Sequence, residues 1–408
     1  MKIVIVGFSL AGFTACRYLL QNAPDSSIEV FSDENYPYYP RPSLYRVLSG
    51  ESKVSDIFIY PLKWYEERNV KVHLGTPVKS LKPAENEIVL AGGNRVSYDS
   101  LLLANGARSF IPSVKGAEKR GVFALRTIDD ALAIREYAKK CKNAVVVGGG
   151  LLGLEISAAL RKLGLNVTIL EFAPWLLPRQ VDQEGSNVLI SEFQKMGMEI
   201  RCGAQTEEIV GNSEVSGLKL KSGESIPAEL VIFATGIRSN IELPREAGIN
   251  VNRGVIVDDY MRTNFENIYA AGDIAEHRGR VYGIIPATTE QAQIAAANMA
   301  GKKMVYKGTI PLNTLKVAGI DLTSIGLVNP ETEGYEQIRR IEAEKCLYKK
   351  LVLKEGKIVG SIIIGERKSA KPMAEIIKQE INVEKVKNKI LQEEFDLNQL
   401  LKNKQSST

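Results

Sequence analysis

The sequence predicts an α/β protein in which one nucleotide-binding domain is inserted into another and a small α+β domain follows. Three observations predict this class. A strand–glycine loop–helix–strand unit occurs twice, strand ends that run into glycine flank the second copy, and short alternating strands begin after about residue 306. The length of 408 residues allows two to three domains.

The first unit lies at the N-terminus. Lys2–Val6 is a β-branched run typical of a buried strand, and it breaks into the loop Gly7–Gly12 before a helical pattern begins. The next strand, Ile28–Phe31, ends at Ser32-Asp33-Glu34, where an acid can bind a ribose hydroxyl. Ser9 replaces the middle glycine of the usual pattern, and its small side chain can itself donate to a phosphate.

The second unit repeats this order near the middle of the chain. Ala144–Val147 leads into the loop Gly148–Gly153, and the strand Val167–Leu170 ends at Glu171. In such a loop the first glycine makes the tight turn and the second lets backbone approach a pyrophosphate. The third packs helix on strand, and the helix N-terminus attracts the phosphate charge. The repeat therefore predicts two Rossmann-like domains with separate nucleotide sites.

Other strand ends predict where the domains meet. Two strands that end in glycine-containing loops, Leu101–Ala107 and Leu230–Gly236, lie on either side of the second unit. The chain would cross between domains at these places. We therefore assign residues 1–108 and 239–305 to the first domain and residues 109–238 to the inserted one. Residues 306–373 are expected to form the C-terminal α+β domain, and residues 374–408 a helical tail. The strands expected in the C-terminal domain are Leu315–Val317, Thr323–Leu327, Tyr348–Leu353 and Ile358–Gly365.

Composition excludes several classes of protein. Four cysteines without a CxxC pair, together with two histidines, argue against a disulfide scaffold, a metal site and a Ser–His triad. No apolar run reaches the roughly 18 to 20 residues that would cross a bilayer. The sequence thus favours a soluble, reduced, cytoplasmic protein that binds neither membrane nor metal.

Together these motifs resemble the FAD-dependent pyridine nucleotide-disulfide oxidoreductase superfamily over about residues 1–370. Within it the chain is most similar to the NADH:rubredoxin oxidoreductases, on the motifs Tyr36–Pro42, Trp64–Glu66 and Leu315–Gly319 and on the short C-terminal domain. The NADH-accepting part of nitrite reductase is similar too. The resemblance implies an enzyme with FAD in the first domain and NADH in the second.

The resemblance also implies, residue by residue, how FAD would be held. The pyrophosphate would lie on the helix after the first loop, Asp273 would hold the ribityl hydroxyls, and Arg41 would lie near the flavin phosphate or ring. Either Asp33 or Glu34 would bind the ribose. The implied set is Gly7, Ser9, Leu10, Ala11, Gly12, Asp33, Glu34, Arg41, Asp273 and, by its backbone at the adenine, Val78.

For NADH the resemblance implies a second set of contacts: Gly148, Gly150, Leu152, Gly153, Glu171 and Gly236. A carboxylate at Glu171 can bind the 2′-hydroxyl of NADH and would repel the 2′-phosphate of NADPH. Two residues are expected to be catalytic. Glu155 would lie near the nicotinamide amide, and Lys316 near the pyrimidine edge of the flavin, where reduced flavin is negatively charged.

A missing thiol predicts the route of the electrons. Disulfide reductases of this superfamily use a cysteine pair, and related oxidases use one cysteine after the second FAD strand. Here that place reads Arg41–Arg46 without cysteine, and Cys16 is expected to be a buried apolar residue. Electrons would then leave FAD directly, for a rubredoxin-type acceptor. The alternatives are another acceptor (a nitrite reductase component or oxygen) and a slow flavin-bound redox sensor or interaction protein.

The charge of the C-terminal region suggests where such a partner would bind. From Glu336 to Thr408 there are sixteen Lys or Arg against eleven Asp or Glu, a surplus equal to the net charge of +5 of the whole chain. Nucleic acid is not expected, because the surplus is modest and lacks aromatic interleaving. The residues expected to attract a small acidic carrier are Lys349, Lys350, Arg367, Lys368 and Lys371. His277 is expected at the surface, and the oligomeric state is left open.

Overall fold

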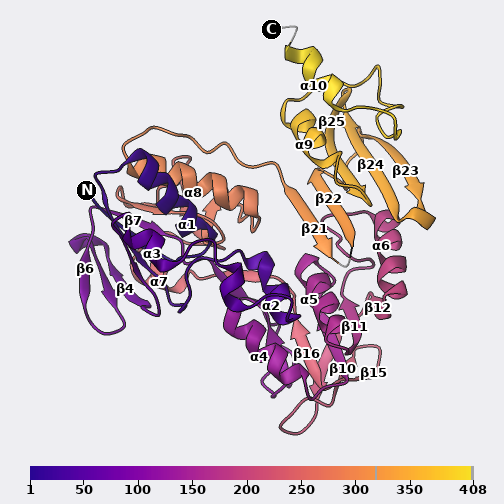
Figure 1. The fold of residues 1–408 in the computed structure, drawn as a ribbon, viewed down its shortest axis with the longest axis horizontal. Helices are drawn as coiled ribbons and strands as arrows, with labels where there is room; N and C mark the ends of the chain where they lie inside the picture. Colours follow the sequence, from indigo (N-terminus) through magenta and orange to yellow (C-terminus); the bar gives the residue numbers. More distant parts are fainter. Residues whose placement is uncertain (318, 406–408) are drawn as a thin grey trace. The chain divides into compact units, whose positions relative to one another are not determined.

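The computed structural model describes residues 1–317 and 319–405, which divide into two compact units (Figure 1). The first unit comprises Met1–Val47, Ser52–Phe110 and Gly236–Thr309. The second comprises Leu48–Glu51, Ile111–Thr235 and the described residues from Ile310 on. Each unit has its own sheets and is described by itself.

A five-stranded parallel sheet, in the order β19-β7-β1-β2-β3, forms the centre of the first unit. Its strands are β1 (Lys2–Val6), β2 (Ser27–Phe31), β3 (Val70–His73), β7 (Ser100–Leu103) and β19 (Ile268–Ala270). Strands covered on both faces are continuous apolar runs, and Ile3–Val6 and Leu101–Leu103 are buried throughout. The two strands predicted for the first unit are confirmed as β1 and β2.

Two helices of the first unit pack against each other beside this sheet: α1 (Leu10–Asn22), which follows β1, and α8 (Ile285–Met299). The other elements of this unit are short. They are α3 (Leu62–Glu66), β4 (Val78–Lys82), β5 (Glu87–Leu90), β6 (Arg95–Ser97), β8 (Ala107–Ser109), β17 (Ile237–Ser239), α7 (Glu242–Glu246), β18 (Val255–Val257) and β20 (Ala275–His277). Helix α2 (Leu44–Leu48) lies where the chain passes from the first unit to the second.

The second unit contains another parallel sheet, in the order β12-β11-β10-β16-β9. Its strands are β9 (Val122–Ala124), β10 (Asn143–Val147), β11 (Asn166–Glu171), β12 (Met198–Cys202) and β16 (Leu230–Phe233). Around it lie α4 (Ile128–Ala138), α5 (Leu151–Lys162), α6 (Gln183–Lys195), β13 (Thr206–Val210), β14 (Gly217–Leu220) and β15 (Ser225–Pro227). The strands predicted on either side of the second glycine loop are confirmed as parts of β10 and β11.

The C-terminal part of the second unit is an antiparallel sheet in the order β21-β22-β25-β24-β23. Its elements are β21 (Leu312–Val317), β22 (Ile320–Gly326), β23 (Glu336–Glu342), β24 (Leu347–Lys354), β25 (Lys357–Ile364), α9 (Ala370–Lys378) and α10 (Asn398–Gln405). The four predicted strands are confirmed, and β23 was not predicted. It is an edge strand rich in charged residues, so its composition does not resemble a buried strand.

The prediction of a continuous helical tail is wrong between α9 and α10. Glu380, with a φ of 51°, follows the end of α9, and residues 381–397 form turns and irregular segments with one β-bridge, at Asn382. Their apolar side chains, including Val383, Ile390 and Leu391, still pack into the same core as α9. Burial of apolar side chains therefore does not require the helix that their spacing suggested.

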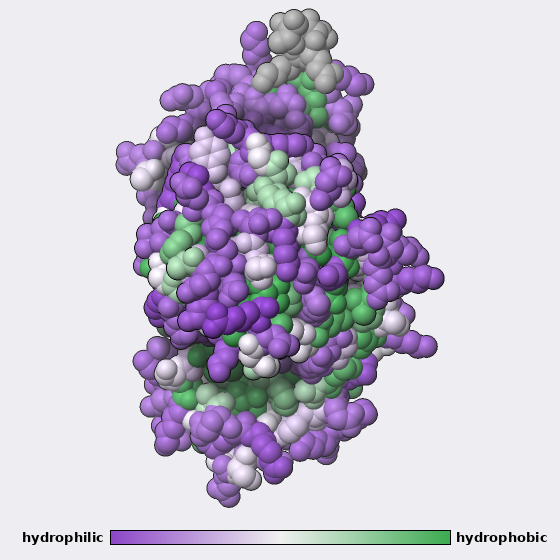
Figure 2. Space-filling view, turned by 90° about the vertical axis from the view of Figure 1, so that its left-hand side faces the viewer, coloured by the Kyte–Doolittle hydropathy of each residue, from purple (hydrophilic) through white to green (hydrophobic). Residues whose placement is uncertain are grey.

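Apolar residues fill the cores of both units, while the face in Figure 2 is covered mainly by hydrophilic residues, with hydrophobic ones in smaller areas between them. Within residues 1–317 and 319–405, no helix is both long and apolar enough to cross a membrane.

Candidate functional site

The first glycine loop joins β1 to α1 in a turn that needs glycine at two places. Gly7 has a φ of +104°, and a Cβ there would lie 2.2 Å from the Ala104 carbonyl oxygen. A Cβ on Gly12 would lie 2.0 Å from the carbonyl oxygen of Gly7. The first glycine therefore makes the turn and the last lets α1 pack closely, as the motif predicts.

The second loop, between β10 and α5, has the same geometry. Gly148 has a φ of +119°, and a Cβ there would lie 2.5 Å from the Ala234 oxygen, while a Cβ on Gly153 would lie 1.9 Å from the Gly148 oxygen. No atom lies within 4 Å of the place of a Cβ on Gly150. The middle position thus leaves open space, which suits the approach of a ligand to the backbone.

The helices that follow the two loops begin without a side-chain cap. Ser9 and Gly150 hold the N-cap positions of α1 and α5, and neither makes a capping hydrogen bond. Helices α4 and α6, in contrast, are capped by Thr127 and Asp182. The uncapped ends present backbone N–H groups and a positive dipole end, which fits the pyrophosphate of a dinucleotide. Leu10, Ala11 and Leu152 belong to these first turns.

Glu171 ends β11 beside the second loop. Its carboxylate accepts hydrogen bonds from the backbone N–H of Gly149 and of Ala173, each at 2.7 Å. A Cβ on Gly149 would lie 2.4 Å from Leu176 and 3.1 Å from the Glu171 side chain. Glycine is therefore needed at position 149, where its N–H binds the Glu171 carboxylate and a Cβ would not fit. The glycine pattern alone does not reveal this role.

The two acids predicted after β2 lie in different surroundings. Glu34 forms an ion pair with Arg41 and accepts a hydrogen bond from the Tyr39 hydroxyl. Asp33 is exposed. The carboxylate of Glu34 is thus engaged by the chain itself, while that of Asp33 faces solvent.

The Gly272–Asp273 turn lies beside the first glycine loop. Gly272 has a φ of +86°, and a Cβ there would lie 3.0 Å from the Cβ of Ala11 and 3.2 Å from Thr288 on α8. The Ser239 hydroxyl donates to the carbonyl oxygen of Asp273 at 2.6 Å. The first unit therefore brings the glycine loop and the turn of Asp273 together, as predicted for one cofactor site. Val78 starts β4 and is partly buried against the core of the same unit.

The predicted catalytic residues lie on packed elements of the second unit. Glu155 is on α5 and Lys316 is exposed on β21, and these two elements contact each other. Burial raises the pKa of Glu155 to about 7. Gly236, an expected NADH contact, has a φ of +104°. It directly follows Thr235, the last residue of the segment Ile111–Thr235 of the second unit.

The raised pKa of Glu155 predicts a pH-dependent contribution to stability. Its ordinary pKa of 4.5 is raised to about 7 in the folded chain, so the neutral carboxyl favours folding below 4.5 and this contribution is lost as the pH rises through 7. We expect Glu155→Gln to gain melting temperature relative to wild type between about pH 5 and about pH 8. Glu118→Gln, at an exposed position, is the control and should show a constant difference. A constant difference for Glu155→Gln as well would contradict the raised pKa.

None of the four cysteines belongs to the segment Arg41–Arg46. Cys16 is fully buried on α1, where burial raises its pKa to about 12. Cys141, Cys202 and Cys346 belong to the second unit, and burial raises the pKa of each. In the described part of the chain, no group of three or more His, Cys, Asp or Glu could hold a metal ion.

Two predictions about surface charges are wrong. Lys349 and Lys350 are 6% and 2% exposed, and they form ion pairs with Glu366 at 3.0 Å and Asp182 at 2.9 Å. They cannot attract a partner, whereas Arg367, Lys368 and Lys371 are exposed as predicted. His277 is also buried, 1% exposed, and its Nε2 lies 2.8 Å from Asp259. Each of these groups is buried because a carboxylate distant in sequence meets it.

Comparisons with known proteins agree with this geometry. The family model described as pyridine nucleotide-disulphide oxidoreductase matches residues 1–301, and the one described as rubredoxin NAD+ reductase C-terminal domain matches residues 311–381. Among solved structures, the covalent putidaredoxin reductase–putidaredoxin complex contains a chain that is 26% identical, with a TM-score of 0.88 and 99% of each chain covered.

Two curated relatives show the range of functions. The NAD(P)H nitrite reductase of Bacillus subtilis (strain 168) is 40% identical over 385 residues, which are 94% of this chain and 48% of that protein. The NADH-rubredoxin oxidoreductase of Clostridium acetobutylicum is 30% identical, with 90% of this chain and 91% of that protein covered. The chain spans about half the length of the first relatives it matches. The predictions of the fold class and of an FAD- and NAD(H)-dependent oxidoreductase are confirmed, and the chain belongs to the pyridine nucleotide-disulphide oxidoreductase family.

Proposed function

We propose that this chain takes reducing equivalents from NADH and passes them, one electron at a time, to a small iron–sulfur or rubredoxin-type protein. The observation that carries the proposal is the lack of a usable thiol on the FAD side. The segment Arg41–Arg46 contains no cysteine, and Cys16 is buried with a raised pKa. Without a thiol relay, the electrons leave for an external acceptor directly.

The residues of the first unit would hold FAD. The backbone from Gly7 to Gly12 and the uncapped start of α1 would bind the pyrophosphate, and Asp273 would accept hydrogen bonds from the ribityl hydroxyls. Asp33 would bind the adenosine ribose, because Glu34 is already paired with Arg41. Bound FAD supplies the conversion between two-electron and one-electron chemistry. We keep residues 1–108 and 239–305 as the proposed FAD domain.

The residues of the second unit would orient NADH. The loop Gly148–Gly153 would bind its pyrophosphate, and Glu171 its adenosine ribose. Glu155, with its pKa of about 7, would hold or release a proton near the nicotinamide amide. Lys316 would place a positive charge where reduced flavin is negative. Residues 109–238 are the proposed NADH domain and 306–373 the proposed C-terminal domain, and a cytoplasmic location stays a prediction.

A second candidate function is the NADH-accepting part of a nitrite reductase. It is favoured by the 40% identity over 94% of this chain to a nitrite reductase of which the chain covers 48%. The rubredoxin-type proposal is favoured in turn by the C-terminal family match and by a relative named NADH-rubredoxin oxidoreductase, of which 91% is covered.

Stopped-flow oxidation separates these candidates. The protein is first reduced by NADH without oxygen and is then mixed with rubredoxin, with a plant-type ferredoxin, with oxygen, or with a nitrite reductase haem subunit plus nitrite. We expect rubredoxin or the ferredoxin to oxidise the flavin fastest at equal concentration. Fastest oxidation by the nitrite reductase subunit would favour the second candidate. If oxygen were fastest, or if NADH did not reduce the protein, the proposed function would be wrong.

Replacement of the cysteines tests the thiol-free route. Because Cys16 is buried and the other three cysteines lie in the second unit, the Cys→Ser variant at all four positions should reduce the acceptor within a few-fold of wild type. The rate of flavin oxidation by the acceptor is the measurement, and circular dichroism confirms folding. Cys16→Ala alone is the control for the loss of packing. A folded variant without turnover would reveal a thiol relay.

The exposed cations near α9 are the proposed steering surface for an acidic acceptor. Arg367, Lys368 and Lys371 remain exposed after Lys349 and Lys350 are excluded. Charge reversal of the three to Glu should lower the association rate about tenfold at low salt, and the difference should vanish as salt shortens the screening length from about 30 Å at 0.01 M to about 10 Å at 0.1 M. Charge reversal of Lys79, Lys82 and Arg95, exposed on the first unit, is the matched control. Equal rates for both variants at all salt concentrations would show that the surface does not steer.

A further inference from the structure

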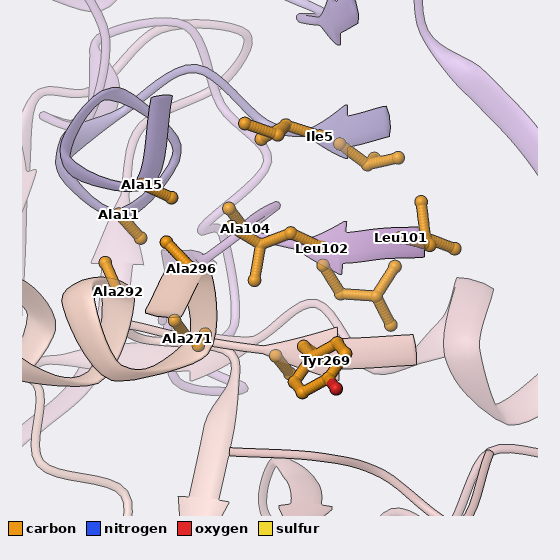
Figure 3. Close-up of a cluster of buried hydrophobic side chains, with 14 of the residues drawn as sticks. Ile5, Ala11, Ala15, Leu101, Leu102, Ala104, Tyr269, Ala271, Ala292 and Ala296 are labelled. Carbon is orange, nitrogen blue, oxygen red and sulfur yellow. The ribbon is translucent and has the colours of Figure 1, made fainter. Parts of the chain in front are cut away.

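Gln291 is a buried polar residue at the contact between α1 and α8. Ala11 and Ala15 on α1 face Ala292 and Ala296 on α8 in Figure 3, and their small side chains let the two helices approach closely. Gln291 is 1% exposed. A side chain with both a donor and an acceptor is costly to bury, so its partners define its role.

One end of Gln291 holds the turn that precedes Asp273. Its Oε1 accepts a hydrogen bond from the backbone N–H of Gly272 at 3.0 Å. Gly272 has a φ of +86°, and a Cβ there would make tight contacts with Ala11 and Thr288, at 3.0 and 3.2 Å. The glutamine oxygen is therefore what satisfies this buried N–H, and it fixes the direction in which the chain leaves toward Asp273.

The other end of Gln291 carries its amide nitrogen. In the described residues the Nε2 atom of Gln291 is buried without a hydrogen bond of its own. Burial raises the pKa of the Tyr306 hydroxyl, and the Gln291 side chain acts against this increase. The hydroxyl also lies 2.8 Å from the Oγ1 of Thr309. The glutamine thus stands between the Gly272–Asp273 turn and the segment that continues into the C-terminal domain.

Tyr306 itself is buried and held by contacts with its neighbours. It is 1% exposed, and its backbone N–H donates to the Asp259 carbonyl oxygen at 2.7 Å. Its ring meets the ring of His277 edge-on, with centroids 4.8 Å apart, and His277 is held by the Asp259 carboxylate. Buried His277, which has no part in the proposed chemistry, therefore packs against Tyr306.

We propose that Gln291 is a positioning residue for FAD: its amide oxygen fixes the Gly272–Asp273 turn, and its amide nitrogen couples that turn to Tyr306. The inference rests on Asp273 as the proposed ligand of the ribityl chain, and it does not depend on which protein accepts the electrons. The affinity of the apoprotein for FAD is the property that it controls.

Titration of apoprotein with FAD, followed by flavin fluorescence, tests the inference. Gln291→Leu keeps the size of the side chain and removes both polar ends, so we expect affinity to fall about tenfold, which corresponds to about 1.4 kcal/mol. Gln293→Leu, on the exposed side of the same helix, is the control and should bind within about twofold of wild type. Gln291→Leu binding as tightly as Gln293→Leu would overturn the proposal.

A double-mutant cycle tests the coupling to Tyr306. Tyr306→Phe removes only the hydroxyl, and it should weaken FAD binding in wild type but add little in Gln291→Leu. Additive losses would overturn the coupling, and this conservative variant keeps the test valid if Gln291→Leu fails to fold. Asp273→Asn separately tests the underlying assumption that Asp273 binds the ribityl chain of FAD. If it binds FAD normally, the assignment of Asp273 is wrong; if it alone weakens binding, the role of Gln291 is wrong.

Discussion

We expect Glu171 to favour NADH over NADPH, and its replacement by serine to remove this preference. The carboxylate is fixed by two backbone N–H groups, those of Gly149 and Ala173, each at 2.7 Å. A 2′-phosphate bound there would face a fixed negative charge. Two like charges about 4 Å apart repel by about 1 to 4 kcal/mol at effective dielectric constants of 80 to 20, which is roughly a ten- to a few-hundred-fold preference for NADH.

The measurement is kcat/KM for both cofactors, with flavin reduction followed at constant salt. In Glu171→Ser the ratio of the two efficiencies should shift toward NADPH by at least about tenfold, because the repulsion is lost and the Gly149 N–H becomes available to a phosphate. Glu199→Ser, at an exposed position on the neighbouring strand β12, should leave the ratio unchanged. Equal efficiencies of wild type with both cofactors would contradict the role of Glu171.

The parts of the fold that could be predicted are those whose sequence signal is local. Gly7, Gly12, Gly148 and Gly153 are needed because any Cβ would meet a backbone oxygen within a few residues or on the adjacent strand. Such steric demands allow one residue type only, so they are visible in a single sequence. The apolar runs of β1 and β10 are equally direct, because strands covered on both faces have no polar alternation.

The parts that could not be predicted depend on partners far away in the sequence. Lys350 is 168 residues from Asp182, and no sequence pattern near either residue predicts their ion pair. Consecutive lysines on a strand point to opposite faces, and β24 lies between two other strands, so each face can bury one of them. The same reasoning applies to His277 with Asp259 and to Gln291 with Gly272, where the hydrogen-bond partner is known only once the chain is folded.

Loss of the positive charge at Lys350 is expected to destabilise the second unit strongly. Lys350 is 2% exposed, and its Nζ lies 2.9 Å from an Asp182 oxygen that also accepts from the Tyr348 hydroxyl at 2.7 Å. Burial alone would raise the pKa of Asp182, but the hydrogen bonds from Lys350, Tyr348 and Gly185 hold it below its usual value. Without the lysine, a partly buried carboxylate at the start of α6 loses the nearer of its two counter-charges, because Arg339 lies 3.8 Å from the same oxygen.

Lys350→Met keeps the length of the side chain and should cost about 3 to 5 kcal/mol, the usual effect of leaving one half of a buried ion pair. At about 2 to 4 °C per kcal/mol for a body of this size, thermal unfolding of the holoenzyme followed by circular dichroism should shift by roughly 10 °C. Lys354→Met, exposed at the end of the same strand, should change stability by no more than about 0.5 kcal/mol.

The double variant Asp182→Asn/Lys350→Met distinguishes the loss of a charge partner from a simple loss of packing. Asparagine is a good N-cap and can still accept from the Gly185 N–H, which donates to Asp182 at 3.0 Å in wild type. With no buried charge left, the double variant should recover most of the stability that Lys350→Met loses. A double variant as unstable as Lys350→Met would contradict the attribution of the loss to the unpaired charge of Asp182.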